Sequence, residues 1–147
     1  MVIPSTNLAS FIIQGNQVMP NNLVDASTAL KNSDLYSVVN LLSSDIASAN
    51  FNVHSPFDRI VANPNNLISA FNFWQSAVAQ MLLDGNAYIA IERDKNNIPI
   101  RLEMAPAAQV IVTLADSSAT INYSVNWNDE RGSVNYPSAN MLHFRLM

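Results

Sequence analysis

The chain has no cysteine, only three glycines and few charged side chains. The absence of cysteine excludes disulfides and thiolate metal sites within these 147 residues. Three isolated glycines, at positions 15, 85 and 132, cannot form a glycine-rich phosphate loop, which excludes the Walker and dinucleotide-binding motifs. No apolar run approaches the roughly 18 residues that span a bilayer, so we expect no membrane segment.

Charged residues make up 12% of the chain, against about 25% in an average globular domain. Seven basic and eleven acidic side chains give a net charge of −4, and no two basic residues are adjacent. Proteins that grip nucleic acid cluster Lys and Arg, so this pattern argues against direct DNA binding. The low content of charged residues argues against disorder. The neutral surface predicts either a weakly charged soluble domain or a module covered by neighbouring subunits.

The chain divides into a short arm and one domain. Residues 1–23 form the N-terminal arm, in which Phe11-Ile12-Ile13 predicts a short strand or an apolar anchor. We expect this arm to pack weakly by itself and to be flexible. Residues 24–147 are long enough for one domain with a real core, and begin with a short predicted helix over 24–31.

The first main helix is predicted over residues 34–49, with Ser33 or Asp34 as its N-cap. Apolar residues recur in it at spacings of three and four, which predicts one buried face. That face consists of Leu35, Val38, Val39, Leu42, Ile46 and Ala49. Asn40 and Ser44 are expected on the opposite side.

The second main helix is predicted over residues 70–83. Ser69 is a good N-cap, and Gly85 suits the left-handed position that ends a helix. The predicted buried stripe contains Phe71, Trp74, Val78, Met81 and Leu82. Before this helix, residues 59–62 predict one helical turn that Pro64 ends.

After Gly85 the hydrophobic period changes from that of a helix to that of a strand. Strands are predicted over 86–93, 98–104, 109–114, 120–127, 133–136 and 141–146, with another over 51–54 before the second helix. The strand over 98–104 is expected to have one dry and one wet face, and Pro99 predicts an edge position. The fold class is therefore α+β, with two main helices packed on a mainly antiparallel sheet of four to six short strands.

No residue pattern indicates catalysis, and we expect no cofactor and no metal. His54 and His143 lie on separate predicted strands without carboxylates at ligand spacing. Glu92 and Asp94 flank a turn, so we interpret them as hairpin charges in solvent and not as an acid–base pair. No serine lies in a nucleophile elbow. The aromatic residues near the second helix are interpreted as core, because no basic residues interleave with them to bind nucleic acid.

Several short motifs follow one another in a characteristic order. These are the turn Asn63-Pro64-Asn65, a helix carrying Phe71 and Trp74, and the corner Gly85-Asn86-Ala87-Tyr88, which leads into a strand. With the flanking segments from residue 29 to residue 146, they resemble the portal (head–tail connector) proteins of tailed bacteriophages. The nine residues of these motifs are the candidate site residues, and their expected role is structural.

The resemblance implies that residues 24–147 form the wing-like part of a portal subunit, with the stem, clip and crown outside this chain. It implies a structural, non-enzymatic role in a dodecameric homo-oligomeric ring at the capsid vertex, which serves DNA packaging and ejection. The implied partners are the terminase packaging motor, capsid and head–tail adaptor proteins. Double-stranded DNA would pass mainly through regions absent here. The implied location is the virion, and the host cytoplasm during assembly.

Two alternatives stay open at the level of sequence. One is an interaction module of a virion or secretion apparatus, without catalytic activity and with an unrelated α+β fold. The other is a small-molecule enzyme or binding domain with a pocket around Trp74 and Tyr88.

Overall fold

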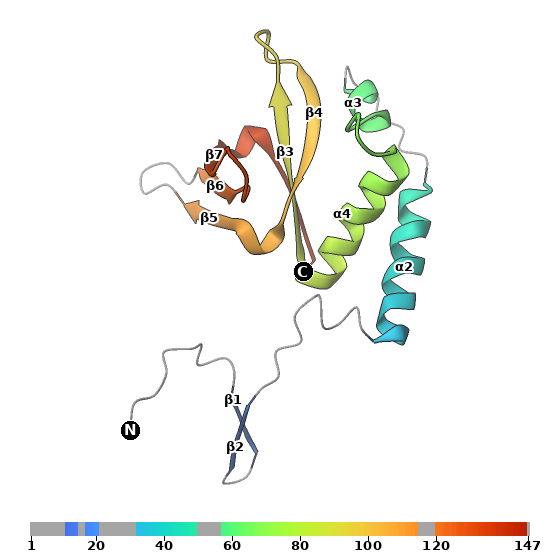
Figure 1. Cartoon of the computed structure of the whole chain (residues 1–147), viewed down its shortest axis with the longest axis vertical. Helices are drawn as coiled ribbons and strands as arrows, with labels where there is room; N and C mark the ends of the chain where they lie inside the picture. Colours follow the sequence, from blue (N-terminus) through green and yellow to red (C-terminus); the bar gives the residue numbers. More distant parts are fainter. Residues whose placement is uncertain (1–10, 15–16, 21–31, 50–56, 115–119, 147) are drawn as a thin grey trace.

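The computed structural model describes residues 11–14, 17–20, 32–49, 57–114 and 120–146. The predicted helix over 24–31 and the predicted strand over 51–54 lie outside the described residues. Figure 1 shows the order of the layers: α2 (Ser33–Ala47) is outermost, α4 (Ala70–Asp84) lies between α2 and the strands, and the strands form two further layers. The fold is α+β, as predicted.

Both main helices begin on a side-chain cap. Asn32 caps α2, because its side-chain oxygen accepts hydrogen bonds from the backbone N–H groups of Asp34 and Leu35. The prediction of Ser33 or Asp34 was wrong by one or two residues. Ser69 caps α4 through the N–H of Asn72, as predicted.

Gly85 ends α4 with φ 74°, the predicted left-handed conformation. The predicted turn over 59–62 is the short helix α3 (Asp58–Ala62), and it ends before Pro64 as expected.

The predicted buried face of α2 was largely wrong. The buried residues are Val39, Ser43 and Ala47, which recur at a spacing of four. The remaining predicted residues are exposed: Leu35, Val38, Leu42, Ile46 and Ala49. The reason is that small side chains at 43 and 47 face α4 and allow the two helices to approach closely.

Polar residues complete the contact between α2 and α4. The side-chain nitrogen of Gln75 in α4 donates to Asn40 Oδ1 at 3.0 Å and to Ser44 Oγ at 2.9 Å. Asn40 and Ser44 therefore lie toward α4. The prediction that they lie on the side opposite the buried face was wrong.

The buried stripe of α4 was predicted in part. Phe73 and Ala77 are its fully buried residues, while Trp74, Val78, Met81 and Leu82 are half-buried. Phe71 is exposed, because the helix turns positions 73 and 77 toward β3 (Asn86–Arg93) instead.

The strands form two three-stranded antiparallel sheets where the sequence suggested one. The first has the order β4-β3-β8, with β4 at Pro99–Ala105 and β8 at Met141–Arg145. The second has the order β5-β6-β7, with β5 at Val110–Leu114, β6 at Ile121–Asn126 and β7 at Ser133–Pro137. Short 3-10 helices at Ala107–Gln109 and Ser138–Asn140 connect the two sheets.

A separate two-stranded hairpin joins β1 (Phe11–Gln14) and β2 (Gln17–Pro20). This confirms a strand at Phe11-Ile12-Ile13 in the N-terminal arm.

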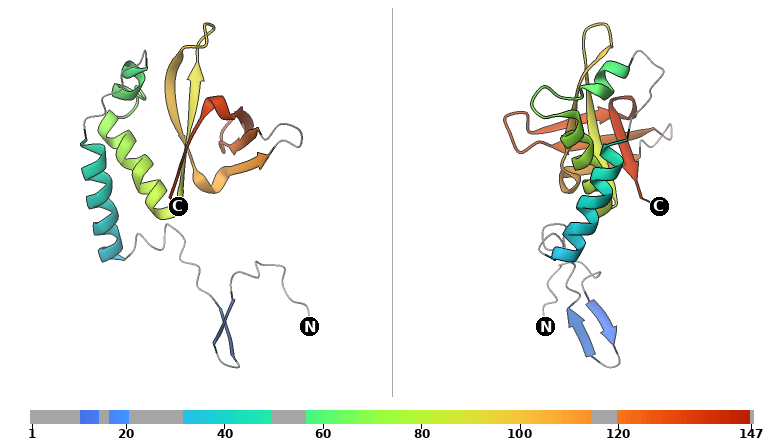
Figure 2. Two further views of the ribbon diagram at one scale, coloured as in Figure 1. Left: turned by 180° about the vertical axis from the view of Figure 1, so that it is seen from behind. Right: turned by 90° about the vertical axis from the view of Figure 1, so that its right-hand side faces the viewer.

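Strand β3 is the centre of the molecule because both of its faces are covered. Ile89 faces α4 and packs with Phe73, Ala77 and Leu102. Tyr88 and Ala90 face the other way and pack with the second sheet. Figure 2 shows this arrangement from behind and from the side, with the β5-β6-β7 sheet across the first sheet from the helices.

Pro99 begins β4 at a sheet edge, as predicted. The expectation of a dry face on this strand was only partly right. Leu102 is buried, but Ile98 and Ile100 are more than half exposed. These two residues border a surface cavity together with Ile60 of α3, so that helix covers them only in part.

Candidate functional site

The Asn63-Pro64-Asn65 turn fastens the end of α3 to the edge of the first sheet. Pro64 is fully buried, and its carbonyl oxygen accepts a 2.7 Å hydrogen bond from the N–H of Leu102 in β4. Asn65 donates to the carbonyl oxygen of Leu102 at 3.3 Å, and its side-chain oxygen accepts from the N–H of Leu67 at 2.8 Å. The turn therefore occupies part of the free edge of β4.

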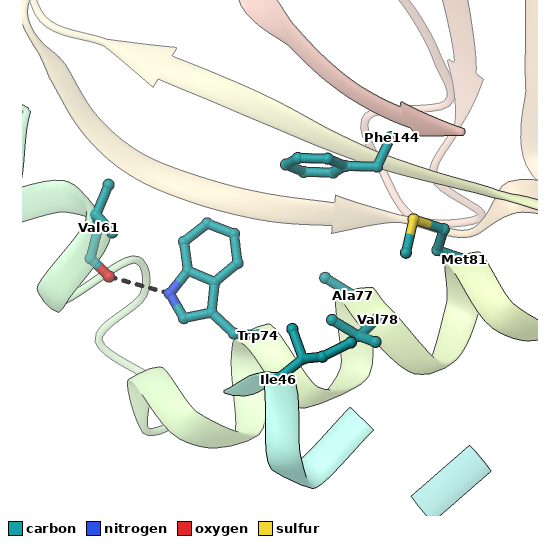
Figure 3. Close-up of a pocket in the computed structure, with 7 residues that line it drawn as sticks. All are labelled: Ile46, Val61, Trp74, Ala77, Val78, Met81 and Phe144. Carbon is teal, nitrogen blue, oxygen red and sulfur yellow. Dashed lines mark hydrogen bonds between the residues drawn. The ribbon is translucent and has the colours of Figure 1, made fainter. Parts of the chain in front are cut away.

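Trp74 links α4 to α3 and borders an apolar pocket. Its indole N–H donates to the carbonyl oxygen of Val61 at 3.0 Å (Figure 3). The pocket has a volume of about 310 Å³. The lining residues are all apolar: Ile46, Val61, Trp74, Ala77, Val78, Met81 and Phe144. No titratable side chain is among them, so this pocket offers contact surface but no acid, base or nucleophile.

The Gly85-Asn86-Ala87-Tyr88 corner turns the chain from α4 into β3. The carbonyl oxygen of Gly85 accepts from the N–H of Leu146, just beyond β8, at 2.9 Å. Ala87 is completely buried. A larger residue at position 87 would need space that the packing does not leave.

Asn86 and Tyr88 connect this corner to an aromatic cluster between the two sheets. Asn86 Oδ1 lies 3.0 Å from His143 Nε2, and His143 Nδ1 lies 3.3 Å from the Tyr123 hydroxyl. The ring of Tyr88 lies 4.4 Å from that of His143 and 6.0 Å from that of Tyr123, measured between centroids. His143 is thus a strand histidine with a hydrogen-bond partner at each ring nitrogen.

The environment of this cluster shifts two pKa values. Burial, and then the nearby positive charge of Arg145, lower the pKa of His143. Burial, and then the charge of Tyr123, raise the pKa of Tyr88. Both shifts favour the neutral forms near neutral pH, so the cluster acts as packing and does not supply a charge.

A network of ion pairs joins the first sheet to the turn between β6 and β7. Arg131 binds both carboxylate oxygens of Glu103, at 2.8 and 2.9 Å, and lies 4.1 Å above the ring of Trp127. Arg101 binds Glu92 at 2.6 Å. The hydrogen bonds that Arg131 donates to Asp129 and Glu103 raise its pKa.

Glu92 and Asp94 are engaged separately, as hairpin charges are expected to be. Glu92 pairs with Arg101. Asp94 accepts hydrogen bonds from the N–H groups of Asn96 and Ile98, each at 2.8 Å. Their contacts close the hairpin and show no acid–base arrangement.

The structure places seven of the nine candidate residues in two separate groups. The turn at Asn63-Pro64-Asn65 meets Leu102, whereas the Gly85–Tyr88 corner meets His143. Trp74 lies on the helix side of β3 and Tyr88 on the opposite side, so the two do not share the pocket that one alternative required. Phe71 belongs to neither group and is exposed.

Sequence reasoning missed Leu102, Phe144 and His143 as partners of the motifs. Leu102 lies 37 positions from Asn65, with which it forms a hydrogen bond. His143 lies 57 positions from its partner Asn86. No local pattern signals contacts over such separations. Among the described residues, no cluster of three potential ligands could hold a metal ion, and no helix could span a membrane.

Two helices segregated from two antiparallel sheets define an α+β domain, in which the Asn63-Pro64-Asn65 turn and Gly85 make hydrogen bonds to the backbone of Leu102 and Leu146. The family model for phage portal protein matches residues 33–147. The chain therefore belongs to the phage portal protein family.

Among solved structures, a similar fold occurs in a chain described as the neck of an empty GTA particle computed with C6 symmetry. The TM-score is 0.68 at 13% identity, over 84% of this chain and 37% of that one. This chain thus spans little more than a third of that structure's length, and the likeness concerns the fold. A search of curated proteins finds no match.

Proposed function

We propose that this chain is the wing-like part of a phage or prophage portal subunit, which assembles as a dodecameric homo-oligomeric ring at the capsid vertex. The ring is the conduit for DNA packaging and ejection and the platform for the terminase motor, capsid and head–tail adaptor proteins. The match of the portal family model to residues 33–147 carries this proposal. The part of the subunit described here is architectural and not enzymatic.

The chemistry of the motifs supports an architectural role. The Asn-Pro-Asn turn and the Gly85 corner use their polar groups to fix β4 and β8. The pocket beside Trp74 is lined by apolar groups alone. Side chains that position backbone in this way keep a subunit in shape and leave none of these groups directed at a substrate.

The surface supports contact with neighbouring protein more than contact with DNA. Leu35, Val38, Leu42 and Ile46 are each at least 40% exposed along α2. Exposed apolar patches of this kind mark interaction surfaces. The net charge of −4 disfavours phosphate binding, so DNA would pass mainly along other parts of the subunit.

The decisive experiment is negative-stain electron microscopy with native mass spectrometry on the full-length gene product. Rings of about twelve subunits with a central hole are expected, since heterologous contacts that close produce rings. A monodisperse monomer or dimer across salt and protein concentrations would overturn the proposal. That outcome would favour the alternative of an interaction module of a virion or secretion apparatus without catalytic activity.

The isolated chain of residues 1–147 is the matched control. Without stem and clip, it is expected to be monomeric or weakly associated at micromolar concentration in sedimentation velocity. A tight ring from these residues alone would show that the main assembly contacts lie in this part of the subunit.

A further inference from the structure

The two three-stranded sheets have four edge strands, and three of them carry a feature that discourages pairing. Natural proteins protect edges with proline, charge or a bulge, because an edge exposes unpaired backbone N–H and C=O groups. Strand β4 has Pro99 and an irregular register at Arg93. Strand β7 ends in Pro137, and β8 ends in Arg145.

Strand β5 is the exception. The segment Val110–Leu114 has no charge and no proline, and its register with β6 is regular. Ile111 is 64% exposed and Leu114 67%. Among the described strands β5 pairs with β6 alone, and four of its five residues are apolar, so no described strand covers its outer edge. Such an edge accepts an added strand unless something covers it.

The N-terminal arm supplies a strand of matching character. The first 24 residues contain no charged side chain. The arm forms the β1–β2 hairpin, which is hydrogen-bonded to neither three-stranded sheet and lies away from both in Figures 1 and 2. A two-stranded hairpin alone is at best marginally stable in water. Because Pro20 lies in β2, β1 is the strand whose outer edge is free of proline.

We propose that β1 of one subunit adds to the outer edge of β5 in a neighbouring copy of the same chain. The pairing extends the β5-β6-β7 sheet of one subunit with the hairpin of the next. A second copy of the chain supplies the added strand, because within one chain the β1–β2 hairpin is not paired with β5. Both segments are uncharged, so their contact does not remove a charged side chain from water. The contact is heterologous, the type that closes rings.

The pairing of β1 with β5 goes beyond the proposed function. It rests on that function only because ring assembly places two copies of the subunit side by side. A strand of four residues forms few hydrogen bonds. The contact is therefore weak between free chains and forms when a ring holds two copies close together, since linkage raises the effective concentration. This agrees with the weak association that we expect for the isolated chain.

The absence of cysteine allows a direct test by disulfide formation. Two differently tagged copies of the full-length gene product are co-expressed in a cysteine-free background, one with Ile12→Cys and the other with Val112→Cys. Both positions lie near the middle of their strands, so a centred register brings them together in either strand direction. After mild oxidation, the product that carries both tags is measured on a gel. The control pairs Ile12→Cys with Leu67→Cys, at a surface position that is 83% exposed.

We expect about tenfold more doubly tagged product from the β1–β5 pair than from the control pair, because the ring raises the local concentration of neighbouring strands. Adding Leu114→Lys to the Val112→Cys copy is expected to remove this product, whereas Leu67→Lys in the same copy is expected to leave it unchanged. Equal amounts from both cysteine pairs would overturn the inference. A disulfide that forms only within one chain of a double variant would also overturn it.

Electron microscopy of the same samples separates the two proposals. Rings without the doubly tagged product would leave the portal function in place and remove the strand exchange. The doubly tagged product without rings would support the strand exchange and contradict the portal function.

Discussion

The two main helices have the same length of fifteen residues but differ in how much of their surface is buried. Helix α4 is enclosed between α2 and β3, with Phe73 at 1% exposure. Helix α2 packs on one side only and leaves its larger apolar residues in contact with solvent. The comparison shows that a hydrophobic stripe marks a face suited to burial, but does not say which partner buries it or whether that partner is in the same chain.

The largest expected effect contrasts a buried residue of α4 with an apolar residue of α2. Phe73→Ala should lower the free energy of unfolding by about 3 kcal/mol or more, because it removes a fully buried ring and leaves a cavity. Leu42→Ala, at a position that is 43% exposed, should cost no more than about 1 kcal/mol. Urea denaturation of the two variants measures the difference. Equal losses would mean that α2 is covered in the isolated chain.

The next effect tests the small residues between the helices. Ser43→Leu should destabilise the chain by about 1–3 kcal/mol, because the added side chain would have to separate α2 from α4. Ser37→Leu is the control, since Ser37 lies on the exposed side of the same helix. Thermal denaturation should show a lower midpoint for the first variant only. A normal midpoint for Ser43→Leu would refute the close approach.

The ends of the two helices provide a third contrast. Gly85→Val should cost about 1 kcal/mol or more, because a β-branched residue is strained at φ 74°. An added Cβ would meet no atom within 4 Å, so the cost arises in the backbone. Ser48→Val at the end of α2, where φ is −80°, should change stability by no more than about 0.5 kcal/mol. If both variants unfold at the same urea concentration, the left-handed conformation of residue 85 does not penalise a β-branched side chain.

The smallest effect concerns the sheet on which α4 rests. The pKa of His143 is lowered in the folded chain, so protonation of this side chain favours the unfolded state. The stability that neutral His143 contributes is therefore present above its ordinary pKa of 6.5 and is lost as the pH falls below that value. Unfolding curves at about pH 7.5 and about pH 5.5, on either side of that value, measure this loss. His143→Gln should show a smaller loss between the two conditions. An identical loss in the variant would assign the pH dependence to other groups.

Some features of this chain were determined by local sequence. The cap at Ser69, the left-handed Gly85, the break at Pro64 and the alternation of β6 all follow from the chemistry of a few adjacent residues. The order of helices and strands was therefore predictable, and so was the fold class. The order of motifs also led to the family that the match over residues 33–147 establishes.

Tertiary structure alone decided which surfaces became buried. The division of the strands into two sheets, the contact of Asn65 with Leu102 and the polar contact of Gln75 with α2 all join residues far apart in the sequence. Residues at helical spacing line two faces of α2. The sequence prediction took the face with the larger apolar residues as the buried one. Packing selected the other, because α2 packs on α4 through a face whose buried residues are Val39, Ser43 and Ala47, two of which have small side chains.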